Sequence, residues 1–267
     1  VAPDAPGESG TTITSSGGNN SYFSSSNEGE TTLRSAPQAQ YISVGSGNSA
    51  YSYQSYEEYI TVENWGDAPI NITNWQLKNG KDNRPYYQGG GLQRFSADVA
   101  IIPRATKFLS PTGNNSFQDV ILKRGERAIV TTGSVGVQTP YKIVSFKENS
   151  CSGYIERLPD YAFTPSLSQS CPRPDKEPGI EGLDPECRRF LGTLSSCETP
   201  KFDTRTATGD ICTNCINQRP VSGACVAFAK AHYNYGGCIA YHAGDKGFEG
   251  QNWRIFNCSL LECIGRS

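Results

Sequence analysis

All ten cysteines of this chain lie in its C-terminal part, and this uneven distribution constrains the fold more than any other feature. An even number of cysteines in so dense a set is typical of disulfide-bonded proteins from an oxidising compartment. The chain contains no methionine, even at position 1, so we expect that a signal peptide has been removed on export. The predicted disulfide residues are Cys151, Cys171, Cys187, Cys197, Cys212, Cys215, Cys225, Cys238, Cys258 and Cys263.

The spacing of the cysteines does not determine how they pair, because ten thiols allow a very large number of connectivities. Closure between near neighbours is the simplest expectation, and it gives Cys151–Cys171, Cys187–Cys197 and Cys225–Cys238. A zinc site is the alternative, since Cys212 and Cys215 have the spacing of half a zinc ligand set. A second pair at the same spacing is missing, because Cys258 and Cys263 are five positions apart. Disulfides are therefore preferred, and no metal is expected.

Residues 1–40 form a low-complexity arm that is rich in Ser, Thr, Gly and Asn. Such a segment buries too little apolar surface to offset the conformational entropy that it loses on ordering. We therefore expect another molecule to hold the arm, most simply a neighbouring copy of the chain; the alternative is an arm folded back on its own body. The residues expected at this subunit interface are the apolar ones of the arm and two alternating tyrosines of an edge strand: Ile13, Tyr22, Phe23, Leu33, Tyr51 and Tyr53.

Residues 41–150 show the period-two alternation of β-strands. In the predicted strand at 59–63, Ile60 and Val62 lie on one face. Strands at this spacing, with no helical period between them, indicate a β-sandwich or barrel. Further short strands are predicted at 70–72, 75–77, 99–102, 118–122 and 127–130.

The β pattern fades in residues 151–267, where the sequence predicts a cysteine-rich extension with short helices. A helix is expected from 184 to 191, with Asp184 as its N-cap and Pro185 at its first position. A second helix is expected from 225 to 233. Residues 252–256 are strand-like, and we expect them to return to the sheet of the preceding region.

The predicted β region resembles the lamin-tail domain, which is an immunoglobulin-like β-sandwich. The resemblance consists of a glycine-containing turn, an apolar alternation and a Trp-x-Leu strand, followed by a strand pair, at residues 58–64, 66–72, 74–79 and 124–133. The fold that it implies is mainly β, a lamin-tail-type sandwich.

The cysteine-rich part is similar to the extension that secreted lamin-tail proteins of small-genome bacteria carry. The matching stretches are 151–156, 163–172, 184–187, 233–238 and 250–256, together with His242. The resemblance implies one elaborated sandwich with a disulfide-rich, partly helical cap. It also implies a role in attachment or assembly, and it supplies no catalytic residue. The tail with Cys258 and Cys263 departs from the family pattern.

The composition and motifs argue against several functional classes. The net charge of −2 offers no basic field for a nucleic acid, and no run of eighteen apolar residues spans a bilayer. There is no Gly-x-Ser-x-Gly elbow, and no phosphate-binding loop follows the glycines at 89–91. Only His232 and His242 are present; His242 and Asp245 have the spacing of a base and its orienting acid, but a partly exposed structural histidine is the preferred interpretation. We expect neither an enzyme nor a cofactor.

These features predict an extracellular structural protein at the cell surface, a subunit of a filament or lattice in which the arm of one copy lies on the next. Its partners would be copies of itself. The alternative is a monomeric binding or adhesion module whose ligand is a surface glycan or a protein on another cell.

Overall fold

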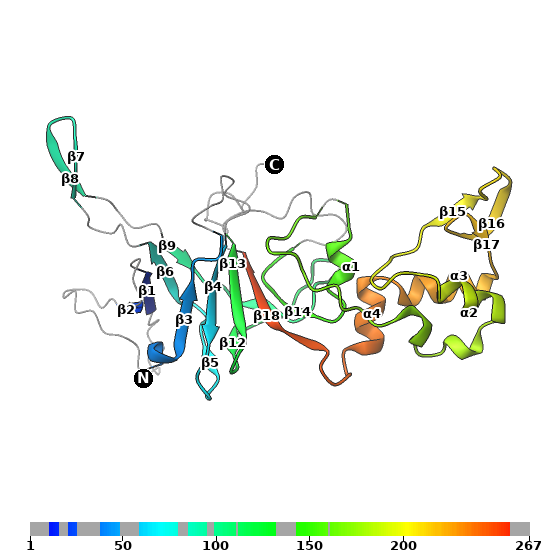
Figure 1. Ribbon diagram of the computed structural model, residues 1–267, viewed down its shortest axis with the longest axis horizontal. Coiled ribbons are helices and arrows are strands. Elements are labelled where there is room, and N and C mark those ends of the chain that lie inside the picture. The colour runs from blue at the N-terminus through cyan, green and yellow to red at the C-terminus, as the bar shows by residue number, and fades with distance from the viewer. Residues whose placement is uncertain are drawn as a thin grey trace, which may run out of the picture.

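The computed structural model is mainly β, with several sheets and a group of short helices. It describes residues 11–15, 21–25, 38–48, 59–79, 85–94, 99–110, 112–131, 143–159 and 161–256. Most of the strands lie toward one end of the molecule, and the helices α2 to α4 lie toward the other (Figure 1). None of the helices in these ranges combines the length and the hydropathy that a bilayer crossing requires.

The central element is a seven-stranded sheet. The strand predicted at 252–256 lies within β18, which pairs in parallel with β13 and antiparallel with β14. The C-terminal strand is thus inserted in the middle of a sheet whose other strands precede the cysteine-rich segment. The strand order is β11 (Phe117–Gln118), β10 (Ala105–Thr106), β14 (Phe146–Asn149), β18 (Glu249–Phe256), β13 (Arg127–Thr131), β4 (Tyr59–Asn64) and β3 (Ile42–Gly45).

Within the described ranges, four smaller sheets accompany the central one. A four-stranded sheet has the order β2 (Ser21–Ser25), β1 (Thr11–Ser15), β6 (Gln76–Asn79) and β9 (Val99–Ile101). The others are β12 (Ile121–Leu122) with β5 (Ile70–Asn71), the hairpin β7 (Pro85–Gln88) with β8 (Gly91–Arg94), and β15 (Phe202–Arg205) with β16 (Ile211–Ile216) and β17 (Arg219–Pro220).

Two hydrophobic clusters form the core, and the central sheet contributes to both. One cluster joins β3, β4, β13 and β18 to side chains of β5, β6 and β12, including Val62, Leu77 and Trp253. Ile60 packs against this cluster on the same side as Val62, as the alternation predicts. The other cluster joins Phe146 of β14 to the helices and to the half-cystines. All four residues of β14 are buried, and so are residues 253–255 of β18.

Helices α2, α3 and α4 begin at capping residues that are visible in the sequence. Asp184 accepts a hydrogen bond from the backbone N–H of Cys187, as predicted, and Pro185 is the first residue of α2. Ser222 and Asn234 cap α3 and α4 in the same way, so α3 begins two residues before the predicted start at 225. The bounds are α1 Gly153–Glu156, α2 Pro185–Leu191, α3 Gly223–His232 and α4 Tyr235–His242, with 3-10 turns at Ala39–Tyr41, Pro174–Lys176 and Ile180–Gly182.

The disulfide connectivity differs from the predicted local closures. The structure bonds Cys151 to Cys238, Cys171 to Cys197, Cys187 to Cys225 and Cys212 to Cys215. The predicted pairs Cys151–Cys171, Cys187–Cys197 and Cys225–Cys238 are therefore wrong. The reason is that the packing of the helices brings together sulfurs that are far apart in the sequence, and a disulfide needs Cα atoms within about 7 Å.

The closely spaced pair Cys212 and Cys215 is a disulfide, so its sulfurs are not thiolate ligands for zinc. No cysteine is free among the residues that the structure describes. Cys258 and Cys263 lie outside the described residues.

Removing the disulfide between Cys151 and Cys238 should destabilise the protein far more than removing the one between Cys212 and Cys215. The first bridge closes a separation of 87 residues and the second one of 3. Because the entropy lost by the unfolded chain grows with loop length, we expect losses of about 4.6 kcal/mol and about 1.6 kcal/mol for the paired alanine variants. Urea unfolding followed by circular dichroism measures both, and equal losses would contradict the expectation.

Candidate functional site

An edge of the four-stranded sheet is formed by the N-terminal arm. Strand β1 pairs in parallel with β6, with Thr12 opposite Gln76 and Ser15 opposite Asn79. On its other side β1 pairs antiparallel with β2, so the arm contributes a hairpin to the sheet (Figure 1). The strand that receives it comes from a region of the chain that is more than 60 residues away. This pairing is made within one chain.

The structure describes three of the six residues predicted at the subunit interface. Ile13 is in β1, opposite Phe23 of β2, and Tyr22 is opposite Thr14. Ile13, Tyr22 and Phe23 therefore lie in the hairpin at the β6 edge. Leu33, Tyr51 and Tyr53 lie outside the described residues.

A pair of exposed aromatic side chains, Tyr41 and Trp65, lies near the other edge of the fold, beside β3. Trp65 is 54% exposed and Tyr41 is 41% exposed, and their ring centroids are 5.6 Å apart in an edge-to-face arrangement. The backbone N–H of Trp65 donates to the carbonyl of Tyr41, which fixes the two residues side by side. This pair was not among the predicted site residues, although a tryptophan inside a turn was the available signal.

Both histidines of the chain converge on one buried carboxylate, Glu177. The His232 Nδ1 atom lies 3.1 Å from Glu177 Oε2, and the His242 Nε2 atom lies 3.2 Å from both carboxylate oxygens. The Glu177 side chain is only 1% exposed. His242 Nδ1 lies 2.7 Å from Asp245 Oδ2, which is the contact that the spacing suggested. The ring is buried, however, and not partly exposed as expected. Glu177 had no recognisable signal in the sequence.

The partners of His242 require that it be protonated on both nitrogens. Each ring nitrogen faces a carboxylate oxygen, and a carboxylate can only accept, so both nitrogens donate. Burial by itself lowers the pKa of His242, but the hydrogen bonds and charges of Asp245 and Glu177 outweigh it and raise the pKa above its ordinary value. The imidazolium ion thus compensates the buried charge of Glu177.

We call Glu177, His232, His242 and Asp245 the histidine cluster. Aromatic side chains pack around it. The His232 ring is stacked between the rings of Phe228 and Tyr241, at centroid distances of 3.9 Å and 3.8 Å. Burial, and then the charge of Glu177, raises the pKa of the nearby Tyr154 and Tyr233, so both phenols remain protonated. The arrangement fastens α3 and α4 to the loop after Lys176. Its buried nitrogens are not presented to a substrate.

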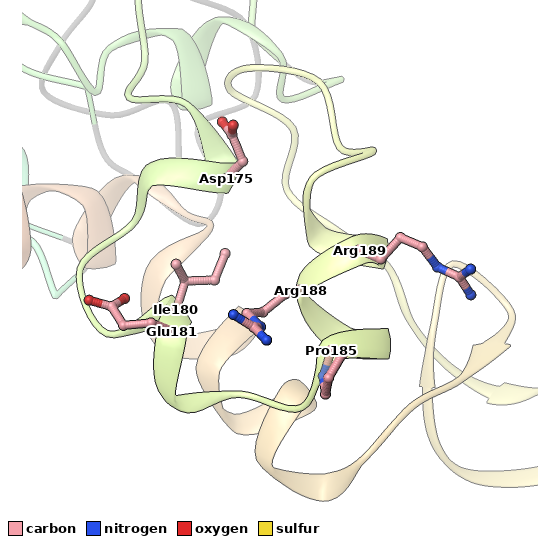
Figure 2. Close-up of a pocket in the computed structure, with 6 residues that line it drawn as sticks. All are labelled: Asp175, Ile180, Glu181, Pro185, Arg188 and Arg189. Carbon is pink, nitrogen blue, oxygen red and sulfur yellow. The ribbon is translucent and has the colours of Figure 1, made fainter.

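A shallow cavity of about 360 Å³ lies beside α2 (Figure 2). Arg188 extends toward Ile180 and Glu181, whereas Arg189 points away from them (Figure 2). The two guanidinium groups therefore do not converge on one anion. Within the described ranges, no group of three or more His, Cys, Asp or Glu side chains has a metal-binding arrangement. The lining residues are Asp175, Ile180, Glu181, Pro185, Arg188 and Arg189.

Comparison with known proteins identifies no relative of this chain. No family model matches it, and neither a curated protein nor a solved structure is similar to it.

The protonated His242 should make the stability of the fold depend on pH. Its pKa is raised in the folded state, so its contribution is complete below the unfolded value of about 6.5 and is lost as the pH rises through the folded pKa. We expect the melting temperature to fall as the pH rises above about 6.5. His242→Gln should abolish that part of the dependence, and Asp245→Asn should shift it to lower pH. Differential scanning calorimetry from pH 6 to 9 tests this; identical profiles for the wild type and His242→Gln would contradict it.

Proposed function

We propose that this protein is a non-enzymatic structural subunit of an extracellular filament or lattice at the cell surface. In this proposal the β region is a lamin-tail-like, immunoglobulin-type sandwich, and the arm of one copy supplies β1 to the β6 edge of the next. Four disulfides in the described residues support an extracellular setting, because such bonds persist in oxidising compartments. The observation that carries the proposal is the parallel pairing of β1 with β6.

The β6 edge accepts a strand from a segment that is distant in the sequence. Strand addition of this kind depends on main-chain hydrogen bonds, so it tolerates the small polar side chains of the arm. The same pairing made with a second copy would have the same local contacts as the pairing within one chain, which is the basis of domain swapping. An exchange that passes from copy to copy without closing produces a polymer.

A cysteine pair across the β1–β6 register distinguishes exchange from folding back. Thr12 and Gln76 are opposite each other, and neighbouring strands place such Cα atoms close enough for a disulfide. In the Thr12→Cys/Gln76→Cys variant, arm exchange predicts a ladder of multimers on a non-reducing gel after oxidation. Each single variant serves as its control. A doubly substituted chain that runs only as a monomer would overturn the proposal.

The exposed pair Tyr41 and Trp65 favours a second candidate function, a binding module for a surface glycan or another protein. Aromatic side chains provide rigid, amphipathic contact area, and both members of this pair are exposed. The other two tryptophans, Trp75 and Trp253, are buried, so the emission of Trp65 reports selectively on this surface.

If this second function is correct, a surface glycan should quench the tryptophan emission of the monomer in a saturable way. Trp65→Ala, whose affinity is measured with that of the wild type by isothermal titration calorimetry because the variant lacks the fluorescent reporter, should bind about tenfold or more weakly, since it loses the central contact. Tyr87→Ala, at an exposed tyrosine of the β7–β8 hairpin, is the matched control and should have no effect. Equal affinity of the wild type and Trp65→Ala would exclude this surface.

A further inference from the structure

A buried lysine lies between two carboxylates in the middle of the fold. The Lys147 Nζ atom is 2.8 Å from Glu126 Oε1 and 3.2 Å from Glu249 Oε2. The side chain of Lys147 is 4% exposed and that of Glu126 is 11% exposed, whereas Glu249 is 37% exposed and reaches the surface. The three residues belong to β14, to the turn before β13, and to β18.

The surroundings of Lys147 make a charged pair expensive there. Its Nζ atom lies 5.1 Å from the centre of the Trp253 ring. Lys147 itself belongs to β14, whose four residues are all buried. Taking an ammonium and a carboxylate out of water carries a large desolvation penalty, which their mutual attraction repays only in part. An amide between the two groups carries no charge and avoids that penalty. Low access of water also favours a condensation that releases water.

We propose that Lys147 and Glu126 are joined by an isopeptide bond, formed by the folded protein itself, with Glu249 as the group that carries the proton. The Lys147 nitrogen attacks the side-chain carboxyl carbon (Cδ) of Glu126. A new C–N bond forms, and the bond between that carbon and Oε1 breaks. This inference goes beyond the proposed function and does not depend on arm exchange.

The step is balanced within these residues. The ammonium group of Lys147 gives up two protons and keeps one on the amide nitrogen. Glu249 accepts a proton from Lys147 and passes it to Glu126, whose Oε1 takes up both released protons and leaves as water. The positive charge of the lysine and the negative charge of the glutamate disappear together, and Glu249 ends as the carboxylate that it was.

Two contacts support this assignment of roles. Glu126 Oε2 accepts a hydrogen bond of 3.1 Å from the backbone N–H of Lys123, which is placed to stabilise the negative charge that develops on this oxygen and then the amide carbonyl. Glu249 Oε1 lies 2.7 Å from Lys107 Nζ. This hydrogen bond lowers the pKa of Glu249, which keeps its side chain a carboxylate at neutral pH.

A second buried ion pair in the same sheet makes a useful comparison. Arg254 of β18 contacts Glu148 of β14, and both side chains are almost fully buried. The guanidinium group of arginine stays protonated and is a poor nucleophile, so this pair remains ionic. The difference between the two pairs is therefore the chemistry of the cation, not its burial.

The mass of the full-length wild-type chain, measured after reduction and unfolding, tests the proposal. We expect a mass lower by one water molecule than the reduced sequence requires. We also expect a branched peptide after digestion in which Lys147 is linked to Glu126, with no tryptic cleavage after Lys147. The full calculated mass, or a water loss located at other residues, would overturn the proposal and would leave the proposed function untouched.

Variants separate the roles of the three residues. Lys147→Arg keeps the positive charge and should show the full mass, and Glu249→Gln keeps both reacting groups and should show little or no bond formation. Glu63→Gln, at a half-exposed carboxylate paired with Arg127, is the matched control and should retain the loss of water. An unchanged yield of the linked peptide in Glu249→Gln would show that Glu249 does not carry the proton. If a variant fails to fold, the wild-type mass and peptide map still decide whether the bond exists.

Discussion

The insertion of β18 between β13 and β14 is the contact on which the rest of the structure depends. It returns the chain to the central sheet after the cysteine-rich segment, with a parallel neighbour on one side and an antiparallel neighbour on the other. Trp253 and Ile255 then complete one hydrophobic cluster, while Phe256 packs against the other. The β region and the helical cap are therefore parts of one sheet-centred fold. Without β18, β13 and β14 would each lose a hydrogen-bonded neighbour.

This central position explains why the fold contains so many buried charges. All of β14 and residues 253–255 of β18 are buried, so polar side chains there have to find partners inside the protein. Glu148 forms an ion pair with Arg254. Arg254 also donates to the carbonyl of Ser166 and so connects a loop of the cap to the sheet. The buried carboxylate of Glu177 likewise interacts with both histidines. The cap is thus held by disulfides and by compensated charges as well as by apolar contacts.

Sequence reasoning succeeded where local chemistry decides the structure. The alternation of Ile60 and Val62, the cap at Asp184 and the strand at 252–256 all depend on residues that are close together in the chain. It failed for the disulfide partners, because Cys151 and Cys238 meet only after α1 and α4 have packed. Glu177 was missed for the same reason. Its two histidine partners are 55 and 65 residues away, and nothing near it in the sequence marks it.

The sequence by itself determined that the chain is mainly β, that the cysteines of the described C-terminal part form disulfides, and where several strands and helices begin. These properties follow from periodicity, capping and composition, which act over a few residues. Only the tertiary structure decided which cysteines pair, which acid holds the histidines, and that Lys147 lies between Glu126 and Glu249. Such contacts join residues that are distant in the chain, and they arise from the way in which the two clusters enclose the central sheet.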